Sequence, residues 1–336
     1  MLRELNSLPE GLLELSASEL HQRLDGPTLL HLPGRHPEPL FVSVLLHGNE
    51  DTGWEAMRQL LHKYQGKELP RALSLFIGNI SAAKAGVRRL DGQVDYNRIW
   101  KGDGGTEHAM ARQMVESMRR RQVFASIDIH NNTGLNPHYA CINVQQQQFM
   151  HLATLFSRIV VYFTQPDGVQ SMAFSELCPA VTVECGKVGQ AHSTEHALQF
   201  VEAALHLDHF PEHPVSAHDY DLFHTVATVK VPASIDFAFG RGGEALCFVA
   251  DLDHLNFREL PSGTLLARFT DPAARLEAWD EAGNDVAERY FTHENGSLKT
   301  RLPVMPSMLT LNEAVIRQDC LCYLMERLPP LSDATC

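Results

Sequence analysis

Strand-like and helix-like segments alternate along the first two thirds of this chain, and this alternation most constrains its fold. Short apolar runs typical of buried strands are followed by amphipathic stretches typical of helices. The pattern predicts an α/β fold: a mostly parallel or mixed sheet with helices on both faces. We expect strands at 28–32, 40–46, 72–77, 123–129, 159–163 and 180–185, and helices at 51–64, 108–122, 149–156 and 193–207.

The composition of the chain changes near residues 210–214, which read F-P-E-H-P. After this point the chain has short strand-like runs separated by Gly, Pro and Asp/Asn turns, without long helical periodicity. We therefore predict two domains in the 336 residues: a larger one over 1–214 and a smaller β-rich one over 215–336. The strand-like runs of the second part are 224–231, 245–249, 264–269 and 298–302.

Charge and cysteine content exclude several classes of protein. The net charge of −13 argues against nonspecific binding to nucleic acid or to an anionic membrane. No apolar run is long enough for a transmembrane helix, and the N-terminus does not resemble a signal peptide. The seven cysteines are an odd number without a C-x-x-C pair. We expect reduced thiols in a cytoplasmic protein. Nothing in the sequence indicates the oligomeric state.

Polar residues follow three of the predicted strands at the point where each strand ends. The first strand is followed by His47 and Glu50, the second ends near His130, and the third ends at Glu184. Ligands of open α/β sheets bind outside the carboxyl ends of the strands, where such side chains can converge. Catalytic zinc sites commonly use three histidine or carboxylate ligands and a water. The set His47, Glu50 and His130 would leave Glu184 free to act as a general base.

Each of these residues also has an ordinary structural interpretation when it is taken alone. A His-x-x-Glu pair is often only a polar turn after a strand, and a single histidine such as His130 is often a satisfied core residue. Asp128 shares a side of its strand with His130, where it could orient the imidazole or be a buried acid with hydrogen-bond partners of its own. The combination of the three strand ends is what favours a metal site.

Five ordered motifs resemble the succinylglutamate desuccinylase/aspartoacylase family, whose members are zinc acylases related to the zinc carboxypeptidases. L-H-G-N-E-D-T-G at 46–53 is similar to the family's H-G-N-E-x-T-G motif, and G-N-I-S-A-A-K-A-G-V-R at 78–88 to its following G-N-P segment. D-Y-N-R-I-W at 95–100, D-I-H-N-N-T at 128–133 and V-E-C-G-K at 183–187 resemble its other three motifs. A weaker similarity in 251–267 resembles the β-rich C-terminal domain of the family.

The resemblance implies a role for each matching residue of the metal centre. His47, Glu50 and His130 would bind zinc, Glu184 would activate water and later protonate the leaving amine, and Arg88 would stabilise the oxyanion.

The resemblance also implies how the substrate is held. Asn97 and Arg98 would bind a substrate carboxylate, because a guanidinium offers a bidentate fork to this group. Together with zinc, Arg88 and Arg98 would make the pocket locally positive, so that an acidic protein could accept a small anionic substrate.

Several positions depart from the family's motifs or leave an alternative open. Ile80 replaces the usual proline, and the loop between Arg88 and Asn97 has two extra residues. Arg89 is adjacent to Arg88 and is the alternative arginine for the site. The residues that contact the far end of the acyl group have no match. Candidates for pocket positions, with ordinary packing or surface roles as the alternative, are Tyr139, Tyr162, Lys187, His138 and His192.

The sequence thus predicts a zinc-dependent hydrolase that cleaves the amide bond of an N-acyl amino acid by metal-activated water. Two alternatives remain open. A metallocarboxypeptidase acting on short peptides would use the same chemistry, and a zinc-binding protein without catalysis would need only the ligands. Glu184 and the arginines argue against the latter, and the β-rich C-terminal region favours the acylase over the peptidase.

Overall fold

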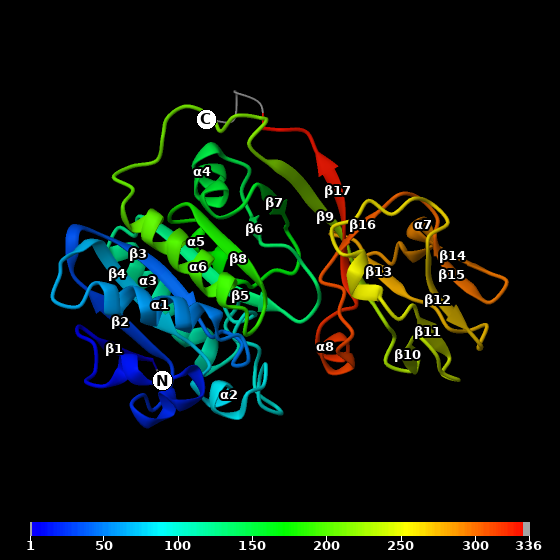
Figure 1. The fold of residues 1–336 in the computed structure, drawn as a ribbon, viewed down its shortest axis with the longest axis horizontal. Coiled ribbons are helices and arrows are strands. Elements are labelled where there is room, and N and C mark those ends of the chain that lie inside the picture. Colours follow the sequence, from blue (N-terminus) through cyan, green and yellow to red (C-terminus); the bar gives the residue numbers. More distant parts are fainter. Residues whose placement is uncertain (1, 332–336) are drawn as a thin grey trace.

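The computed structural model describes residues 2–331 and contains a large mixed sheet and a separate smaller one (Figure 1). The large sheet has the strand order β1-β2-β4-β3-β5-β8-β6-β7-β9-β17-β16, with β13 added beside β9. Its strands are β1 (Arg3–Leu5), β2 (Thr28–Leu32), β3 (Gly34–Val44), β4 (Leu69–Ile77), β5 (Ala125–Asn132), β6 (Tyr139–Ile142), β7 (Ile159–Tyr162), β8 (Ala180–Lys187), β9 (Asp221–Lys230), β13 (Glu277–Trp279), β16 (Met305–Ser307) and β17 (Cys322–Leu328).

The smaller sheet has the order β10-β11-β12-β15-β14 and its own apolar core. Its strands are β10 (Phe237–Phe239), β11 (Leu246–Phe248), β12 (Leu265–Phe269), β14 (Phe291–Glu294) and β15 (Ser297–Thr300). The predicted α/β class with a smaller β-rich part is confirmed. The division at residue 215 stays a prediction, and the large sheet itself continues beyond it through β9, β17 and β16.

Helices cover both faces of the large sheet, as the sequence predicts. Alternate residues of a strand point to opposite faces. Phe41 of β3 stacks on Phe174 of α5 at 4.3 Å on one face, while α1 and α6 pack together on the other. The helices are α1 (Thr52–Lys63), α2 (Ile80–Ala85), α3 (Thr106–Arg120), α4 (Gln147–Phe156), α5 (Gln170–Phe174), α6 (Ala191–Leu205), α7 (Ala287–Tyr290) and α8 (Glu313–Gln318), with 3-10 turns at Leu12–Glu14, Ala17–Gln22 and Leu252–Leu255.

The central strands β4, β3, β5 and β8 run parallel, so their carboxyl ends lie along one edge of the sheet. Apart from residues 34–38 of β3, these strands are buried over almost their whole length, which explains the near-continuous apolar sequence of the buried parts. Their predicted positions agree with the structure to within a few residues, apart from β3, which begins at Gly34 rather than at 40. The predicted strand ends are therefore neighbours in the fold.

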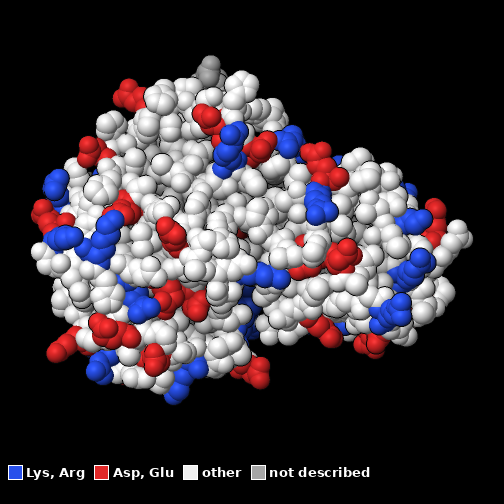
Figure 2. Space-filling view, viewed as in Figure 1, with Lys and Arg blue, Asp and Glu red and all other residues white. Residues whose placement is uncertain are grey.

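The surface has no dominant basic area on the face shown in Figure 2, where acidic and basic side chains are interspersed. Among the described residues, no helix is both long enough and apolar enough to span a bilayer. The six cysteines within residues 2–331 are all free, and Cys336 lies outside the described residues.

Candidate metal and catalytic site

The loop after β3 carries the first two candidate ligands, His47 and Glu50. Leu45 has a φ of 56°, a left-handed conformation that turns the chain away from the strand direction directly before His47. Gly48 is required by close packing: a Cβ at this position would lie 2.2 Å from the backbone of Ala82 and Ala83 in α2. The absence of a side chain at Gly48 lets α2 pack directly against the loop, so both ligands face the same space.

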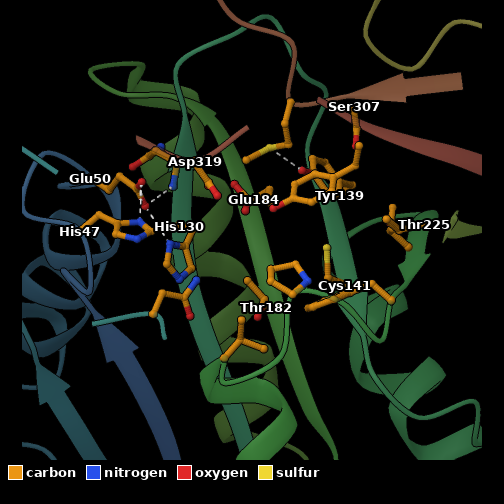
Figure 3. Close-up of a pocket in the computed structure, with 18 of the residues that line it drawn as sticks. His47, Glu50, His130, Tyr139, Cys141, Thr182, Glu184, Thr225, Ser307 and Asp319 are labelled. Carbon is orange, nitrogen blue, oxygen red and sulfur yellow. Dashed lines mark hydrogen bonds and ion pairs between the residues drawn. The ribbon is translucent and has the colours of Figure 1, made fainter. Parts of the chain in front are cut away.

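His47, Glu50 and His130 converge as the sequence predicts (Figure 3). Nδ1 of His47 lies 2.8 Å from Oε1 of Glu50, and Nδ1 of His130 lies 2.8 Å from Oε2 of the same carboxylate. One ligand atom from each of the three residues lies within 4.8 Å of the others. All three side chains are buried, so little of the polar cluster is in contact with bulk water. We refer to these three residues as the triad.

A carboxylate lies beside the Nε2 atom of each imidazole, on the side away from Glu50. Nε2 of His47 lies 3.1 Å from Asp95, and Nε2 of His130 lies 2.9 Å from Asp128. The Ser43 hydroxyl donates to the other oxygen of Asp128 at 2.6 Å. Carboxylates at this position fix the orientation of metal-binding histidines and raise their basicity. The contact with His130 agrees with the interpretation in which Asp128 orients the imidazole.

The charges of the triad suit a divalent cation. Burial alone would raise the pKa of Glu50, but His47 and His130 hold that pKa well below its usual range. Burial would lower the pKa of His130, but Asp128 and Glu50 hold it well above its usual range. The surroundings of Glu50 thus favour its ionised form, and a cation bound by the three side chains would supply positive charge to the same carboxylate. Two imidazole nitrogens and one carboxylate fit the three-ligand set of catalytic zinc.

Glu184 lies beside the triad on the neighbouring strand. It is the register partner of His130 in the parallel pair of β5 and β8, so the two side chains share a face of the sheet. The Asn132 amide donates to Oε2 of Glu184 at 2.8 Å. Burial raises the pKa of Glu184 to about 8. A carboxyl group with this pKa can take up and release a proton near neutral pH.

Arg88, rather than Arg89, reaches the triad. Its guanidinium lies 3.9 Å from Glu50 and donates to Asp95 at 3.1 Å, and it lines the pocket in front of the triad. Arg89 instead donates to the backbone oxygen of Gln93. The loop that carries Arg88 is tied to the ligand loop, because Gly48 donates its backbone N–H to the Arg88 carbonyl at 3.0 Å.

Asn97 and Arg98 line the same pocket as the triad, Arg88 and Glu184. The Oδ1 atom of Asn97 is buried without a hydrogen-bond partner among the described residues, so it is free to contact a ligand. Arg98 donates through Nη1 to the backbone oxygen of Asn97 at 2.8 Å. The structure thus brings the predicted metal, catalytic and substrate-binding positions together in one pocket, and their roles remain predictions.

Residues 39–209 match the model of the succinylglutamate desuccinylase/aspartoacylase catalytic domain, which is more than half of the chain. The chain belongs to this family. The expected resemblance is therefore confirmed, and it makes the chain a member of a family of hydrolytic deacylases.

Two kinds of relatives agree with this family. A succinylglutamate desuccinylase of Yersinia enterocolitica is 26% identical over an alignment of 295 positions that covers 78% of this chain and 84% of that protein. Among solved structures, the fold is similar to a succinylglutamate desuccinylase from Chromobacterium violaceum, with a TM-score of 0.58 and 17% identity over 89% of this chain and 87% of that one. Murine aminoacylase 3 has a TM-score of 0.58 and 17% identity, covering 88% and 96% of the two chains.

Asp319 is a site residue of this family member that sequence reasoning missed. It directly follows α8, and its carboxylate lies 3.3 Å from Nη2 of Arg88 and 3.5 Å from Nη2 of Arg98. A single aspartate after a short helix carries no sequence signal for such a role. Its position depends on how the C-terminal segment returns to the large sheet, which no local pattern predicts.

The other candidates from the sequence divide between the pocket and its surroundings. Tyr139 lines the pocket and donates its hydroxyl to the Met308 sulfur at 3.0 Å. Tyr162 packs against His224 outside this lining. The remaining three lie elsewhere: Lys187 pairs with Asp253 at 3.5 Å, and His138 stacks with His192.

Proposed function

We propose that this protein is a zinc-dependent deacylase that hydrolyses the amide bond of N-acyl amino acids. The observation that carries the proposal is the position of Glu184 directly opposite His130 on adjacent strands, beside the triad. A proton-accepting carboxylate, three ligands suited to zinc and two arginines then line one pocket. Family membership supports the reaction class.

In this proposal, His47, Glu50 and His130 hold the zinc ion. Bound there, zinc would supply a Lewis acid and would lower the pKa of a water toward about 7. Asp95 and Asp128 hold the Nε2 atoms of the two imidazoles, which leaves the Nδ1 atoms of both rings on the side where the ion would bind. The protein's own contribution is thus a buried, oriented set of donors.

Glu184 moves the proton during hydrolysis. Its carboxylate takes a proton from the water as the water oxygen attacks the amide carbon. The same carboxyl group then gives that proton to the amide nitrogen, the C–N bond breaks, and a carboxylic acid and an amine leave. The Asn132 amide holds one oxygen of Glu184, which leaves the other oxygen for the proton transfer.

Arg88 stabilises the charge that develops on the carbonyl oxygen. Its guanidinium lies 3.9 Å from Glu50 of the triad and lines the same pocket, which places it beside the region where the carbonyl would bind. Donors arranged before the reaction, in a site shielded from water, are worth far more than the same donors in bulk solvent. Asp95 and Asp319 both pair with this guanidinium.

Asn97 and Arg98 bind the carboxylate of the amino-acid half of the substrate. The unpartnered Oδ1 of Asn97 and the guanidinium of Arg98 face the pocket. A guanidinium and an amide together fix both the charge and the direction of a carboxylate. The position of Asp319 on the same guanidinium means that a substrate carboxylate must share or replace this contact.

A deacylase is favoured over a peptidase by the C-terminal segment. Ser307, Met308, Asp319 and Tyr323 all come from this segment, and all line the pocket. They occupy space beside the triad that a peptide extending from the scissile bond would need. Small N-acyl groups would not need this space.

The proposal is tested by incubating the zinc-loaded protein with N-acetyl amino acids, N-succinyl amino acids and dipeptides and measuring amine release. We expect release from at least one class of N-acyl amino acid, at rates well above those for dipeptides of the same amino acids. Faster hydrolysis of the dipeptides would favour the peptidase, and no hydrolysis of any substrate would contradict the proposed reaction.

A further inference from the structure

The pocket has few positive charges, and those it has are already balanced. Of all the described residues, the only lysine or arginine side chains that line it are Arg88 and Arg98. Arg88 pairs with Asp95 and Asp319, and Arg98 pairs with Asp319. Each guanidinium therefore has a carboxylate partner before any substrate binds. In the proposed assignment, Arg98 with Asn97 anchors one substrate carboxylate and Arg88 serves the carbonyl oxygen. No lysine or arginine among the described lining residues then remains for a second carboxylate.

The order of strands shows what lies beyond the catalytic carboxylate. From β5 the sheet continues through β8, β6 and β7 to β9. Tyr139 of β6 is the register partner of Glu184 in β8. Cys141 of β6 pairs with Thr182 on one side and with Val161 of β7 on the other. The residues that line the pocket therefore continue from Glu184 across the sheet, away from His130. We call the part lined by Cys141, Val161 and Thr225 the inner end.

The inner end is buried and uncharged. Its three defining side chains are at most 8% exposed. Tyr139, Cys141 and Val161 also belong to an apolar cluster that packs with Phe163 and Met308, which line the pocket too. In Figure 3, Glu184 lies between the triad and Cys141, with Thr225 farther away on the same side. A group that enters this space meets carbon, sulfur and hydroxyl atoms rather than a cation.

The chemistry determines which half of the substrate faces the inner end. The scissile carbonyl must lie at the triad, and the nitrogen must lie near Glu184, which protonates it. Since Glu184 lies between the triad and the inner end, the amino-acid half of the substrate points toward the inner end. Its carboxylate is held by Arg98 and Asn97, which leaves the amino-acid side chain to fill the apolar space.

We propose that this site selects N-acyl amino acids whose side chain is neutral and apolar, and discriminates against aspartate and glutamate. The inference rests on the deacylase function proposed above and specifies its substrate class. An acidic side chain would place a second carboxylate in a buried space with no cation, where an unpaired charge is strongly disfavoured. Asp319 adds a further negative charge near the single anchor.

Three substrates with the same acyl group separate charge from size. N-acetylmethionine, N-acetylglutamine and N-acetylglutamate are each incubated with the zinc-loaded protein, and kcat/KM is measured from amine release. We expect kcat/KM to be highest for N-acetylmethionine. We expect kcat/KM for N-acetylglutamine to exceed that for N-acetylglutamate, which has nearly the same shape but carries a charge, by at least about tenfold. A value for N-acetylglutamate equal to or above that for N-acetylglutamine would overturn the inference.

Binding of the free amino acids provides a readout that does not depend on turnover. Calorimetry on the zinc-loaded protein should show that methionine binds most tightly, glutamine less tightly and glutamate most weakly. If no acetylated substrate is hydrolysed, the deacylase proposal fails, while this order still decides the inference. Glutamate binding as tightly as methionine would contradict it, even if the protein proves to be a deacylase.

Discussion

The carboxylate of Asp319 lies 3.3 Å from Nη2 of Arg88, although 231 positions separate the two residues in the chain. The same carboxylate reaches Arg98 at 3.5 Å. The C-terminal segment therefore supplies an anion to the two arginines that we assign to the oxyanion and to the substrate carboxylate. A substrate carboxylate and Asp319 compete for Arg98.

Replacing Asp319 with asparagine should lower KM for an N-acyl amino acid. The amide keeps the shape of the side chain but removes the charge that competes with the substrate, and a hydrogen bond to a charged group is worth about 1.5–3 kcal/mol. We expect a decrease of roughly fivefold or more in KM. Asp103→Asn, which removes an exposed carboxylate, is the matched control. A higher KM in the Asp319 variant alone would show that Asp319 orients the arginines rather than competing with the substrate.

Glu184→Gln should retain zinc and lose most turnover. The amide preserves the hydrogen-bonding shape but cannot accept the proton of water, and general acid–base catalysis contributes about 10²–10⁴-fold to such reactions. Metal content and kcat are measured on the same preparation. Glu176→Gln, an exposed position before β8, should leave both unchanged. Full turnover in the Glu184 variant would exclude this residue as the base.

His47→Ala should abolish stable zinc binding. The substitution removes one of three ligands and leaves Asp95 and Glu50 without their shared imidazole partner. We expect less than one tenth of an equivalent of metal after dialysis, measured by metal analysis. The exposed His218→Ala variant should keep one equivalent. A full equivalent of zinc in the His47 variant would contradict the ligand assignment.

Gly48→Ala should destabilise the protein and weaken metal binding together. The added Cβ would meet the backbone of α2 at 2.2 Å, so the ligand loop or α2 must move. Overpacking of this kind costs roughly 1–3 kcal/mol in the free energy of unfolding. Gly26→Ala, where no atom lies within 4 Å of the new Cβ, is the control. Equal unfolding free energies for the two variants would show that the loop tolerates the displacement.

The triad and Glu184 could be predicted from the sequence because their positions depend on local features. An apolar strand, its end and the polar residue that follows are adjacent in the chain, and the parallel arrangement of strands then brings such ends to one edge. His130 and Glu184 are 54 positions apart, yet their strands pair directly in register. The resemblance to a family added Arg88, Asn97 and Arg98, which no spacing rule identifies.

The parts that could not be predicted depend on long-range pairing. β9 and β17 lie in the β-rich C-terminal part of the sequence, but they pair with each other and extend the large sheet beside β7. A strand pattern does not indicate which sheet the strand joins. Asp319 lies just before β17, so its approach to the arginines follows from that pairing. The apolar inner end was missed for the same reason, since it is built from β6, β7 and β9.

The dependence of hydrolysis on bound zinc tests the central claim most directly. Amine release from N-acetylmethionine is measured as the chelated protein is titrated with zinc, with metal content determined at each point. We predict that the rate rises in proportion to bound zinc, reaches its plateau at one equivalent and returns to background when the metal is removed again. Hydrolysis at the full rate by the chelated, zinc-free protein would contradict the account.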